Sequence, residues 1–371
     1  MMPARIVGRT LTAALVAAAI IPPSVGADTL YFPPANGPWA HVDPASVGWD
    51  VKALVAALDY ARTAHSSSVV MLLNGRILAE HEWDVDGPPR YARLRIGKTS
   101  DSRVIEDVAS AQKSLVAFLA GVAEGRHQLD LAAPVDRYLG AGWSQADRSA
   151  ESPITVRHLM TMTSGLNDGL NYLQSAGDVW RYNTGAYSRM IGVIEKAVGT
   201  DIQTFTRDVL TGPTGMTDSR WLPRPWSAGN DAANSIGFAT TGRDLARFGL
   251  LILARGTWER KDLLKNPDYL RQMLTPSQDL NPSYGLLWWL NGQRRFQLAG
   301  ATTSQPGSLI PSAPRDLVAA QGALDRKCYV VPSLGLVVTR LGDQTGEAFN
   351  NEFWKLLMKA IPSTKPRPSL Y

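Results

Sequence analysis

The chain has 371 residues, of which 44% are hydrophobic and 19% charged, a composition that is ordinary for a globular protein and excludes a disordered or fibrous chain. Its net charge is +5, and its lysines and arginines are scattered, so the sequence predicts no surface for nucleic acid. A single cysteine, Cys328, excludes an intramolecular disulfide. Because it lies in the strand-like run KCYVV, we expect it to be a small core residue.

The first 27 residues have the pattern of a signal peptide. Arg5 and Arg9 form a basic start, the apolar run LTAALVAAAIIP follows, and the small residues VGA precede Asp28. The apolar run is too short, and too soon followed by prolines, to be a good membrane span. We therefore expect a secreted, periplasmic bacterial protein with no stable membrane insertion after cleavage at Ala27. The alternative is an uncleaved membrane anchor.

The next segments predict a helix followed by a β-hairpin. DVKALVAALDYARTA, residues 50–64, has helical periodicity with Asp50 as its N-cap. SSVVMLLNGRILAEHEW, residues 67–83, contains two strand-like runs joined by Asn74-Gly75, the strongest short signal for a hairpin.

The middle of the chain, residues 109–280, has mainly helical patterning. Helices are expected in SAQKSLVAFLAGVAEG, TVRHLMTMTSG (capped by Thr155), GAYSRMIGVIEKAVG, DIQTFTRDVL and TGRDLARFGLLILARG. The last third returns to strands, in YGLLWWLNGQRRFQLAG with a second Asn-Gly turn at Asn291-Gly292, and in RDLVAAQG, KCYVVP and LGLVVTRLG. EAFNNEFWKLLMKAI predicts a closing helix.

Strands at both ends and helices between them predict an α/β (α+β) fold in one catalytic unit. The expected architecture is an antiparallel sheet built from residues 28–108 plus 281–371 and flanked by helices, with residues 109–280 inserted as a mainly helical lobe. A cleft between two such lobes is the usual place for a site.

Most catalytic constellations are missing from the sequence. It contains no G-x-S-x-G elbow and no H-E-x-x-H, and the spacing of its five histidines suggests no zinc site. The run RLRIGKTS imitates a phosphate-binding loop but has Ala92 where that loop needs glycine. We therefore expect no metal and no cofactor.

A Ser-x-x-Lys motif, Ser110 and Lys113, occurs once, one helical turn apart at the start of a long apolar helix. Two interpretations are open: Ser110 caps the helix while Lys113 extends to solvent, or the pair is a nucleophile and its base. Burial beside a helix N-terminus would lower the pKa of Lys113 and favour the second interpretation. Tyr182-Asn183-Thr184 is the only Tyr-x-(Asn/Ser/Thr) in the chain, and a tyrosine near an ammonium could move a proton to a leaving group. The alternative is a core tyrosine.

With these motifs the chain resembles the serine β-lactamase and penicillin-binding-protein superfamily. It is most similar to the β-lactamase-related serine hydrolases, which include class C β-lactamases, DD-peptidases, family VIII-type esterases and 6-aminohexanoate-dimer hydrolase. The resemblance covers nearly the whole chain after the leader, through VVMLLNGRILAE, EDVASAQKSLVAFLAGVAEG, APVDRYLGAGW, ITVRHLMTMTSGL, TTGRDLARFGLLILARG, YGLLWWLNG and YVVPSLGLVVTRLG. It implies that Ser110 is acylated, that Lys113 takes its proton, and that Tyr182 helps to activate the serine and protonates the leaving group. Thr184 stands where asparagine is frequent and is a candidate for substrate binding.

The third motif of the superfamily, Lys-Thr-Gly or His/Trp-x-Gly on the last inner strand, is altered. Its best match is Ala320-Gln321-Gly322, without a lysine. The resemblance implies that Gly322 lets a backbone approach the substrate and that the N–H groups of Ser110 and Ala323 form an oxyanion hole.

Without that lysine, a substrate carboxylate would lose a charge-assisted hydrogen bond of about 1.5–3 kcal/mol. We therefore expect an ester or linear amide substrate and little penicillin turnover, unless Arg181 or Arg326 points inward. Trp180 and the pair Trp288–Trp289 are candidates for lining an apolar acyl pocket, with Trp180 and Trp288 as the first choices, although a packing role is the more common one for tryptophan.

The sequence thus predicts an exported serine hydrolase that acts on a small ester, amide or peptide-like molecule. The alternatives are a β-lactamase or DD-carboxypeptidase, and a non-catalytic binding protein with this fold. The sequence does not predict an oligomeric state.

Overall fold

The structure, a computed structural model, describes residues 30–85, 87–227 and 234–363. The predicted signal peptide, residues 1–27, lies outside the described residues. Within the described ranges, no helix combines the length and the apolar character needed to cross a membrane.

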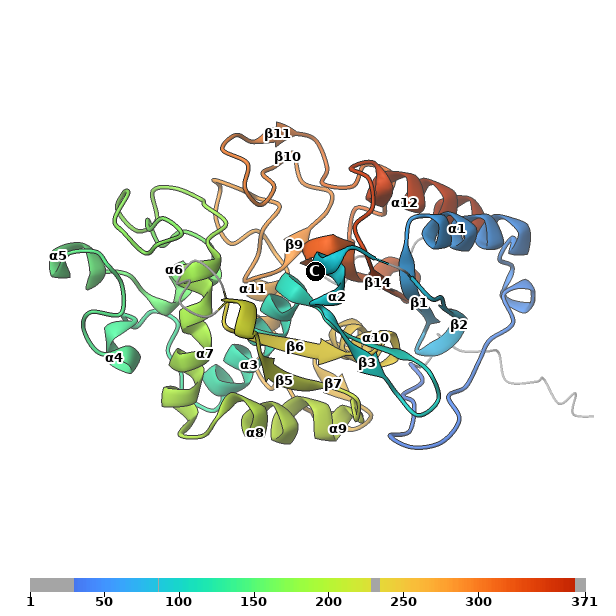
Figure 1. The fold of residues 1–371 in the computed structure, drawn as a ribbon, viewed down its shortest axis with the longest axis horizontal. Helices are drawn as coiled ribbons and strands as arrows, with labels where there is room; N and C mark the ends of the chain where they lie inside the picture. Colours follow the sequence, from blue (N-terminus) through green and yellow to red (C-terminus); the bar gives the residue numbers. More distant parts are fainter. Residues whose placement is uncertain (1–29, 86, 228–233, 364–371) are drawn as a thin grey trace, which may run out of the picture.

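One six-stranded antiparallel sheet joins the two ends of the chain (Figure 1), in the order β2-β1-β14-β13-β12-β9. Its strands are β1 (Ser66–Leu73), β2 (Arg76–Glu82), β9 (Trp289–Leu290), β12 (Val318–Gly322), β13 (Arg326–Val331) and β14 (Leu336–Gly342). Asn74 and Gly75, both with positive φ, join β1 to β2, which confirms the predicted hairpin. Because β1 pairs with β14, the prediction of one sheet built from both termini is also confirmed.

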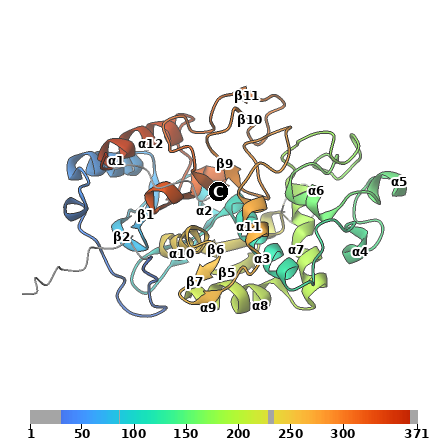
Figure 2. The same ribbon diagram turned by 180° about the vertical axis from the view of Figure 1, so that it is seen from behind.

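Helices cover both faces of this sheet (Figures 1 and 2). Successive side chains of β13 point to opposite faces, and they identify the two layers. Tyr329 packs edge-on against Trp354 of α12 (Phe349–Ala360), beside α1 (Val51–Thr63). The preceding residue of β13, Cys328, points to the opposite face, toward α10 (Gly242–Leu253). There its thiol contacts the Leu245 carbonyl oxygen at 3.6 Å. Cys328 is fully buried, as expected of a core residue.

A second, four-stranded antiparallel sheet has the order β3-β4-β6-β5. Its strands are β3 (Arg95–Lys98), β4 (Val104–Asp107), β5 (Arg220–Pro223) and β6 (Ile236–Thr240). No strand was predicted in any of these four segments, and the last two lie inside the stretch with mainly helical patterning. They are short, and β5 has only one buried residue, so neither shows a clear alternation of polar and apolar residues. β4 leads directly into the turn that carries Ser110.

The remaining helices include α3, whose first twelve residues are all buried and which packs against α7 and α11. They are α2 (Pro89–Ala92), α3 (Gln112–Gly125), α4 (Asp136–Leu139), α5 (Arg148–Glu151), α6 (Val156–Met160), α7 (Thr184–Val198), α8 (Ile202–Thr206), α9 (Gly212–Thr214) and α11 (Pro267–Met273). The predicted caps are present, since the side chains of Asp50 and Thr155 accept backbone N–H groups at the starts of α1 and α6. The helix expected in DIQTFTRDVL is α8 continued by a π-helical turn.

The strands expected around Asn291-Gly292 are much shorter than predicted. Only Trp289–Leu290 joins the large sheet, while β10 (Arg295–Phe296) pairs with β11 (Gln305–Pro306) in a separate ribbon. The reason is the Asn291 side chain, which accepts the Ile310 N–H at 2.8 Å and donates to the carbonyls of Ile310, Ala313 and Pro314. The turn therefore binds a distant loop instead of pairing its own flanks. One further two-stranded ribbon consists of β7 (Thr257–Trp258) and β8 (Lys261–Asp262).

Candidate active site

Ser110 lies in a tight turn between β4 and α3. This turn, η2 (Ala109–Ala111), is a single 3-10 turn in which Ala109 has φ 51°. The left-handed region is unfavourable for alanine by about 1–2 kcal/mol, so the surrounding contacts must impose it. The first helical residue of α3 follows at Gln112, and no side chain caps this helix. The interpretation of Ser110 as a helix cap is therefore wrong.

Lys113 turns toward Ser110 and away from solvent. Only 3% of this residue is exposed, and its Nζ lies 2.9 Å from Ser110 Oγ and 3.5 Å from Thr184 Oγ1. The rings of Tyr187 and Tyr182 flank the amine, with centroids 4.3 and 5.0 Å from Nζ. Burial, and then the positive charge of Arg224, hold the pKa of Lys113 well below its ordinary value. This shift favours the uncharged form of the amine, which is the form that a general base requires.

Tyr182 completes the group from the segment that begins α7. Its phenol hydrogen-bonds with Ser110, which lowers its pKa, but burial has the larger effect and raises that pKa to about 12. The phenol is therefore a proton donor at neutral pH. Asn183 holds the segment in place, because its side chain accepts the Ala186 N–H at 2.8 Å and donates to the Leu166 carbonyl at 2.9 Å.

A cavity of about 670 Å³ opens in front of Ser110. Its lining comprises Ser110, Tyr182, Trp289, Leu298, Ala299, Gln321, Gly322, Ala323, Asp325, Lys327, Gln344, Thr345, Gly346, Glu347 and Asn350. This volume is in the usual range for small-molecule sites.

Gly322 lets the end of β12 pack directly against η2 (Ala109–Ala111), which we name the nucleophile turn after its predicted nucleophile Ser110. A Cβ added there would lie 2.1 Å from the Val108 carbonyl oxygen and 3.3 Å from the Ser110 nitrogen. Only glycine fits this approach, which brings the start of the Ala323 turn to the cavity beside Ser110. The structure therefore brings together Ser110, Lys113, Tyr182, Thr184, Gly322 and Ala323, which lie in three separate segments of the sequence.

Of the three candidate tryptophans only Trp289 lines the cavity, so the first choice of Trp180 and Trp288 is corrected. Trp288 is fully buried and stacks on Phe248 at 5.9 Å, while Trp180 is 3% exposed and packs edge-on against Trp289 at 6.2 Å. Neither residue is part of the cavity lining. Trp289 stacks on the Tyr182 ring at 5.8 Å, with an interplanar angle of 23°.

A lysine that the sequence analysis did not select, Lys327, also lines the cavity. It lies opposite Gln321 in the β12–β13 register, donates to Gln321 Oε1 at 2.8 Å and lies 3.3 Å from Asp325 Oδ1. Burial lowers its pKa, and the Asp325 carboxylate opposes that shift. A search along one strand for the third motif misses this residue; pairing RDLVAAQG with KCYVVP as a hairpin would place it beside Gln321.

The two arginines considered as substitutes do not reach the cavity. Arg326 is completely buried and ion-pairs with Glu106 at 2.8 Å. Arg181 is exposed and ion-pairs with Asp168 at 3.1 Å. The proposal that either residue meets a substrate carboxylate is therefore corrected.

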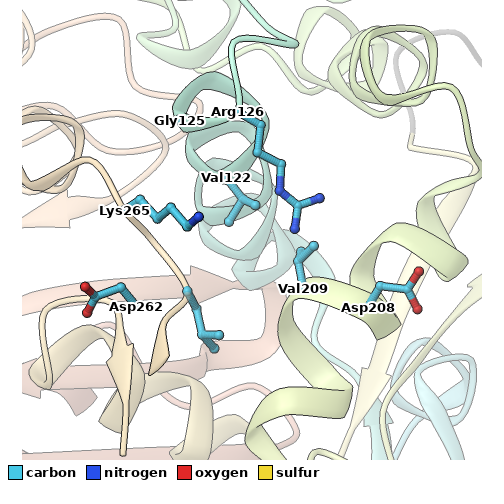
Figure 3. A pocket seen from close by; sticks show the side chains of 8 residues that line it. Val122, Gly125, Arg126, Asp208, Val209, Asp262 and Lys265 are labelled. Atoms are coloured by element: carbon cyan, nitrogen blue, oxygen red, sulfur yellow. The ribbon is translucent and has the colours of Figure 1, made fainter. Parts of the chain in front are cut away.

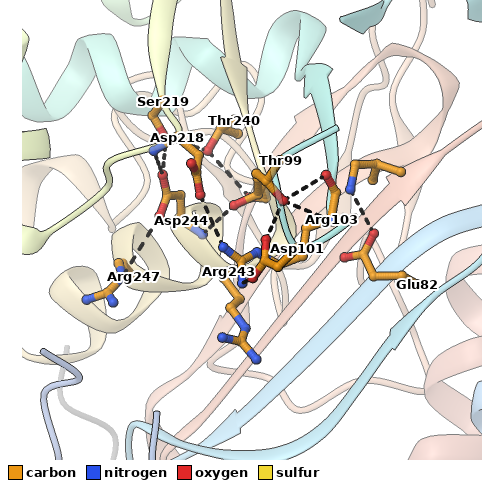
Figure 4. A network of polar contacts seen from close by, with 12 residues as sticks. Glu82, Thr99, Asp101, Arg103, Asp218, Ser219, Thr240, Arg243, Asp244 and Arg247 are labelled. Atoms are coloured by element: carbon orange, nitrogen blue, oxygen red, sulfur yellow. Dashed lines mark hydrogen bonds and ion pairs between the residues drawn. The ribbon is translucent and has the colours of Figure 1, made fainter. Parts of the chain in front are cut away.

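Two other hollows differ from this cavity in what lines them. Figure 3 shows one at the far end of α3, with Arg126, Lys265 and two aspartates around a space of about 110 Å³. Figure 4 shows a polar network near the start of α10, where Arg103 contacts Asp218 at 3.3 Å and Arg247 lies 3.9 Å from Asp244. These four side chains line the second hollow. Neither of the two hollows has a serine and a lysine facing each other in its lining.

The sheet, its helical layers and the serine–lysine–tyrosine group define the class of β-lactamase/transpeptidase-fold proteins. A model of the family described as Beta-lactamase matches residues 51–352, most of the chain. The protein therefore belongs to the β-lactamase family and has the serine hydrolase fold of that family. No curated protein matches the chain in sequence.

Solved structures agree with this fold. A putative β-lactamase from Bacteroides dorei has a TM-score of 0.62 at 18% identity, with 84% of this chain and 99% of that chain covered. A putative 6-aminohexanoate-dimer hydrolase from Bacillus anthracis has a TM-score of 0.59 at 15% identity, with 89% and 87% covered. The D-alanine carboxypeptidase AmpC from Burkholderia cenocepacia has a TM-score of 0.60 at 14% identity, with 84% and 97% covered.

Proposed function

We propose that the protein is an exported serine hydrolase that cleaves esters or linear amides through an acyl-enzyme on Ser110. The observation that supports this most strongly is the distance of 2.9 Å between Lys113 Nζ and Ser110 Oγ, in surroundings that lower the pKa of the lysine. A buried amine without a proton can accept one from the serine hydroxyl, which makes the serine oxygen a nucleophile.

In the first half of the reaction, Ser110 Oγ attacks the substrate carbonyl carbon while its proton passes to Lys113 Nζ. The N–H groups of Ser110 and Ala323 would hold the negative oxygen of the tetrahedral intermediate, a contribution of about 3 kcal/mol per donor in comparable sites. When the intermediate collapses, the bond to the alcohol or amine breaks. Tyr182 gives that leaving group a proton and recovers one from Lys113.

In the second half, water attacks the ester that joins the acyl group to Ser110. Lys113 or Tyr182 accepts the proton of the water, and the serine oxygen takes a proton back as the acid leaves. The products are a carboxylic acid and the free enzyme. Every proton moves between groups of the site and water, so the scheme balances without a metal or a redox partner.

The charges in the cavity favour a substrate without a carboxylate. Lys327 already hydrogen-bonds to Gln321 and ion-pairs with Asp325, so a carboxylate would have to displace one of these partners. Glu347, an exposed acid at the rim, would repel it. Neutral esters and linear amides avoid both costs.

A second candidate, a β-lactamase or DD-carboxypeptidase, is favoured by one observation. Lys327 brings an ammonium group into the cavity from the strand next to β12. If it exchanges Asp325 for a substrate carboxylate, it could replace the missing lysine of the third motif.

One panel of substrates separates these functions: p-nitrophenyl esters of increasing chain length, nitrocefin, and a peptide that ends in D-Ala-D-Ala. We expect kcat/KM to be highest for a neutral ester and at least tenfold lower for nitrocefin. Efficient nitrocefin or peptide turnover would favour the second candidate. No turnover of any member, together with no labelling by a fluorophosphonate, would favour the non-catalytic binding protein.

Export has its own test: N-terminal sequencing of the secreted protein should show that it begins at Asp28.

A further inference from the structure

A buried ion pair lies directly behind the nucleophile turn. Arg224, which follows β5, donates through Nε to Asp107 Oδ2 at 2.7 Å and through Nη2 to Asp107 Oδ1 at 2.6 Å. The two side chains are 7% and 1% exposed and come from segments 117 residues apart. A buried pair of this kind often contributes little net stability, because both charges lose their hydration. A role in fixing local geometry is therefore worth testing.

Asp107 connects this pair to the residue that precedes Ser110. Besides its two bonds to Arg224, its Oδ1 accepts the backbone N–H of Ala109 at 2.8 Å. Ala109 is the residue with φ 51°, a conformation that needs such a local contact. The guanidinium fixes the carboxylate, and the carboxylate fixes the turn from which the Ser110 side chain projects.

Arg224 also holds the other side of the turn through Gln112. Its Nη2 donates to Gln112 Oε1 at 3.0 Å, and the Gln112 amide donates to the Tyr187 hydroxyl at 3.3 Å. The Tyr187 ring packs on the Lys113 amine. One guanidinium thus contacts residues on both sides of Ser110 and, through Gln112, the ring that borders the base.

Space for this arrangement comes from a glycine. A Cβ on Gly237 of β6 would lie 2.2 Å from Asp107 Oδ2 and 2.8 Å from Arg224 Nε. A side chain there would displace the ion pair, so the second sheet leaves room for it.

Arg224 is also the charged group that affects Lys113 most. The groups that face the amine are the Ser110 and Thr184 hydroxyls and the rings of Tyr182 and Tyr187. After burial, the Arg224 charge is what lowers the pKa of the lysine. The pair therefore has two separable effects, one on geometry and one on charge.

We propose that Arg224, held by Asp107 and Gln112, is a positioning residue that sets the nucleophile turn and, through Gln112, the Tyr187 ring beside the Lys113 amine. This inference rests on the proposed function, because its readout is hydrolysis of a neutral ester. The fork geometry of the guanidinium supplies this positioning, and its charge separately contributes to the lowered pKa of Lys113.

Two variants separate the effects. Arg224→Lys keeps the charge but cannot make the two parallel bonds. Arg224→Met combined with Asp107→Asn removes both charges without leaving a lone buried carboxylate, and the asparagine oxygen can still accept the Ala109 N–H. The control is Arg243→Met. This variant breaks the ion pair between Arg243 and Glu80, which also has two hydrogen bonds but lies outside the cavity. All are assayed for kcat and KM against pH, rate of fluorophosphonate labelling, and melting temperature.

For Arg224→Lys we expect kcat to fall about tenfold to a hundredfold with little change in KM, and the acid limb of the pH profile to stay in place. For the double variant we expect the same loss, and an acid limb about half to one pH unit higher, because Lys113 regains part of its basicity. Arg243→Met should lower only the melting temperature.

The proposal is overturned if Arg224→Lys has the wild-type kcat, if the double variant keeps the wild-type acid limb, or if Arg243→Met loses as much activity at an equal loss in melting temperature. Failure of the proposed function looks different, since then the wild type itself neither hydrolyses the ester nor reacts with the probe. In that case the role of Arg224 is refuted with it.

Discussion

Two buried lysines belong to the site, Lys113 against the Ser110 hydroxyl and Lys327 in the cavity lining, and they have opposite surroundings. Lys113 and Lys327 are 3% and 4% exposed. Lys113 faces hydroxyl groups, aromatic rings and the charge of Arg224, whereas Lys327 faces the Asp325 carboxylate and the Gln321 amide. Burial lowers the pKa of both, but only Lys327 has a negative charge that opposes the shift. In this site, the presence of a counter-charge, more than burial, separates the proposed base from a structural cation.

The largest contrast is expected when each lysine is replaced by methionine. Lys113→Met should lower kcat/KM for a neutral ester by about 10³-fold or more, because no base remains. Its melting temperature should hold or rise, since a buried amine without a carboxylate partner is replaced by an apolar chain. Lys327→Met should lose less than about tenfold in activity but about 1–3 kcal/mol of stability, because Asp325 is left without its cation. Equal losses of activity in the two variants would contradict the assignment.

A backbone contact should have the next largest effect. Gly322→Ala places a Cβ 2.1 Å from the Val108 carbonyl oxygen, so the nucleophile turn or β12 must move. We expect a loss of about a hundredfold in kcat from misplacement of reacting groups, with about 1–3 kcal/mol of destabilisation. Gly346→Ala is the matched control, because Gly346 lines the same cavity and a Cβ there meets nothing within 4 Å. If both variants behave alike, the contact at Gly322 has no special role.

The pH dependence should distinguish the lysines more finely. Activity should rise with pH as Lys113 loses its proton and remain high into the alkaline range, because the pKa of Tyr182 is about 12. The folded protein holds the pKa of Lys113 below its value in the unfolded chain. At any pH between these two pKa values, the unfolded chain therefore binds more protons than the folded protein. The free energy of unfolding should therefore rise with pH across that window, and Lys113→Met should lose this rise. Chemical denaturation at several pH values measures it, and an unchanged slope in the variant would refute the interpretation.

The smallest effects are expected from the tryptophans. Trp289→Phe keeps a ring beside Tyr182 but shortens the cavity wall, so we expect a change of about threefold to tenfold in KM for longer acyl chains. Trp288→Phe should leave KM unchanged and lower stability by about 1–2 kcal/mol, because Trp288 is a core residue. A larger effect on KM from Trp288 would restore the original choice.

Much of the fold could be predicted because its signals are local. The Asn74-Gly75 turn and the Asp50 cap act within a few residues, and both are present. The Ser110–Lys113 contact is also local, since one turn of helix brings the two together. Tyr182 required the family resemblance, because nothing near it in the sequence shows which segment it meets.

The parts that were missed depend on contacts between distant segments. Lys327 reaches the cavity through its cross-strand partner Gln321, and Asn291 is captured by a loop about twenty residues further on. Arg224 meets Asp107 across 117 residues. The sequence could not separate Trp288 from Trp289, because β9 is only Trp289–Leu290, and a strand of two residues shows no alternation of side chains that would indicate which tryptophan faces the cavity.

The most direct test is the mass of the intact protein after reaction with a fluorophosphonate, followed by peptide mapping. We predict one adduct on the wild type, located at Ser110, formed faster as the pH rises, and absent from Ser110→Ala. No adduct on the wild type, or an equal adduct on Ser110→Ala, would contradict the account.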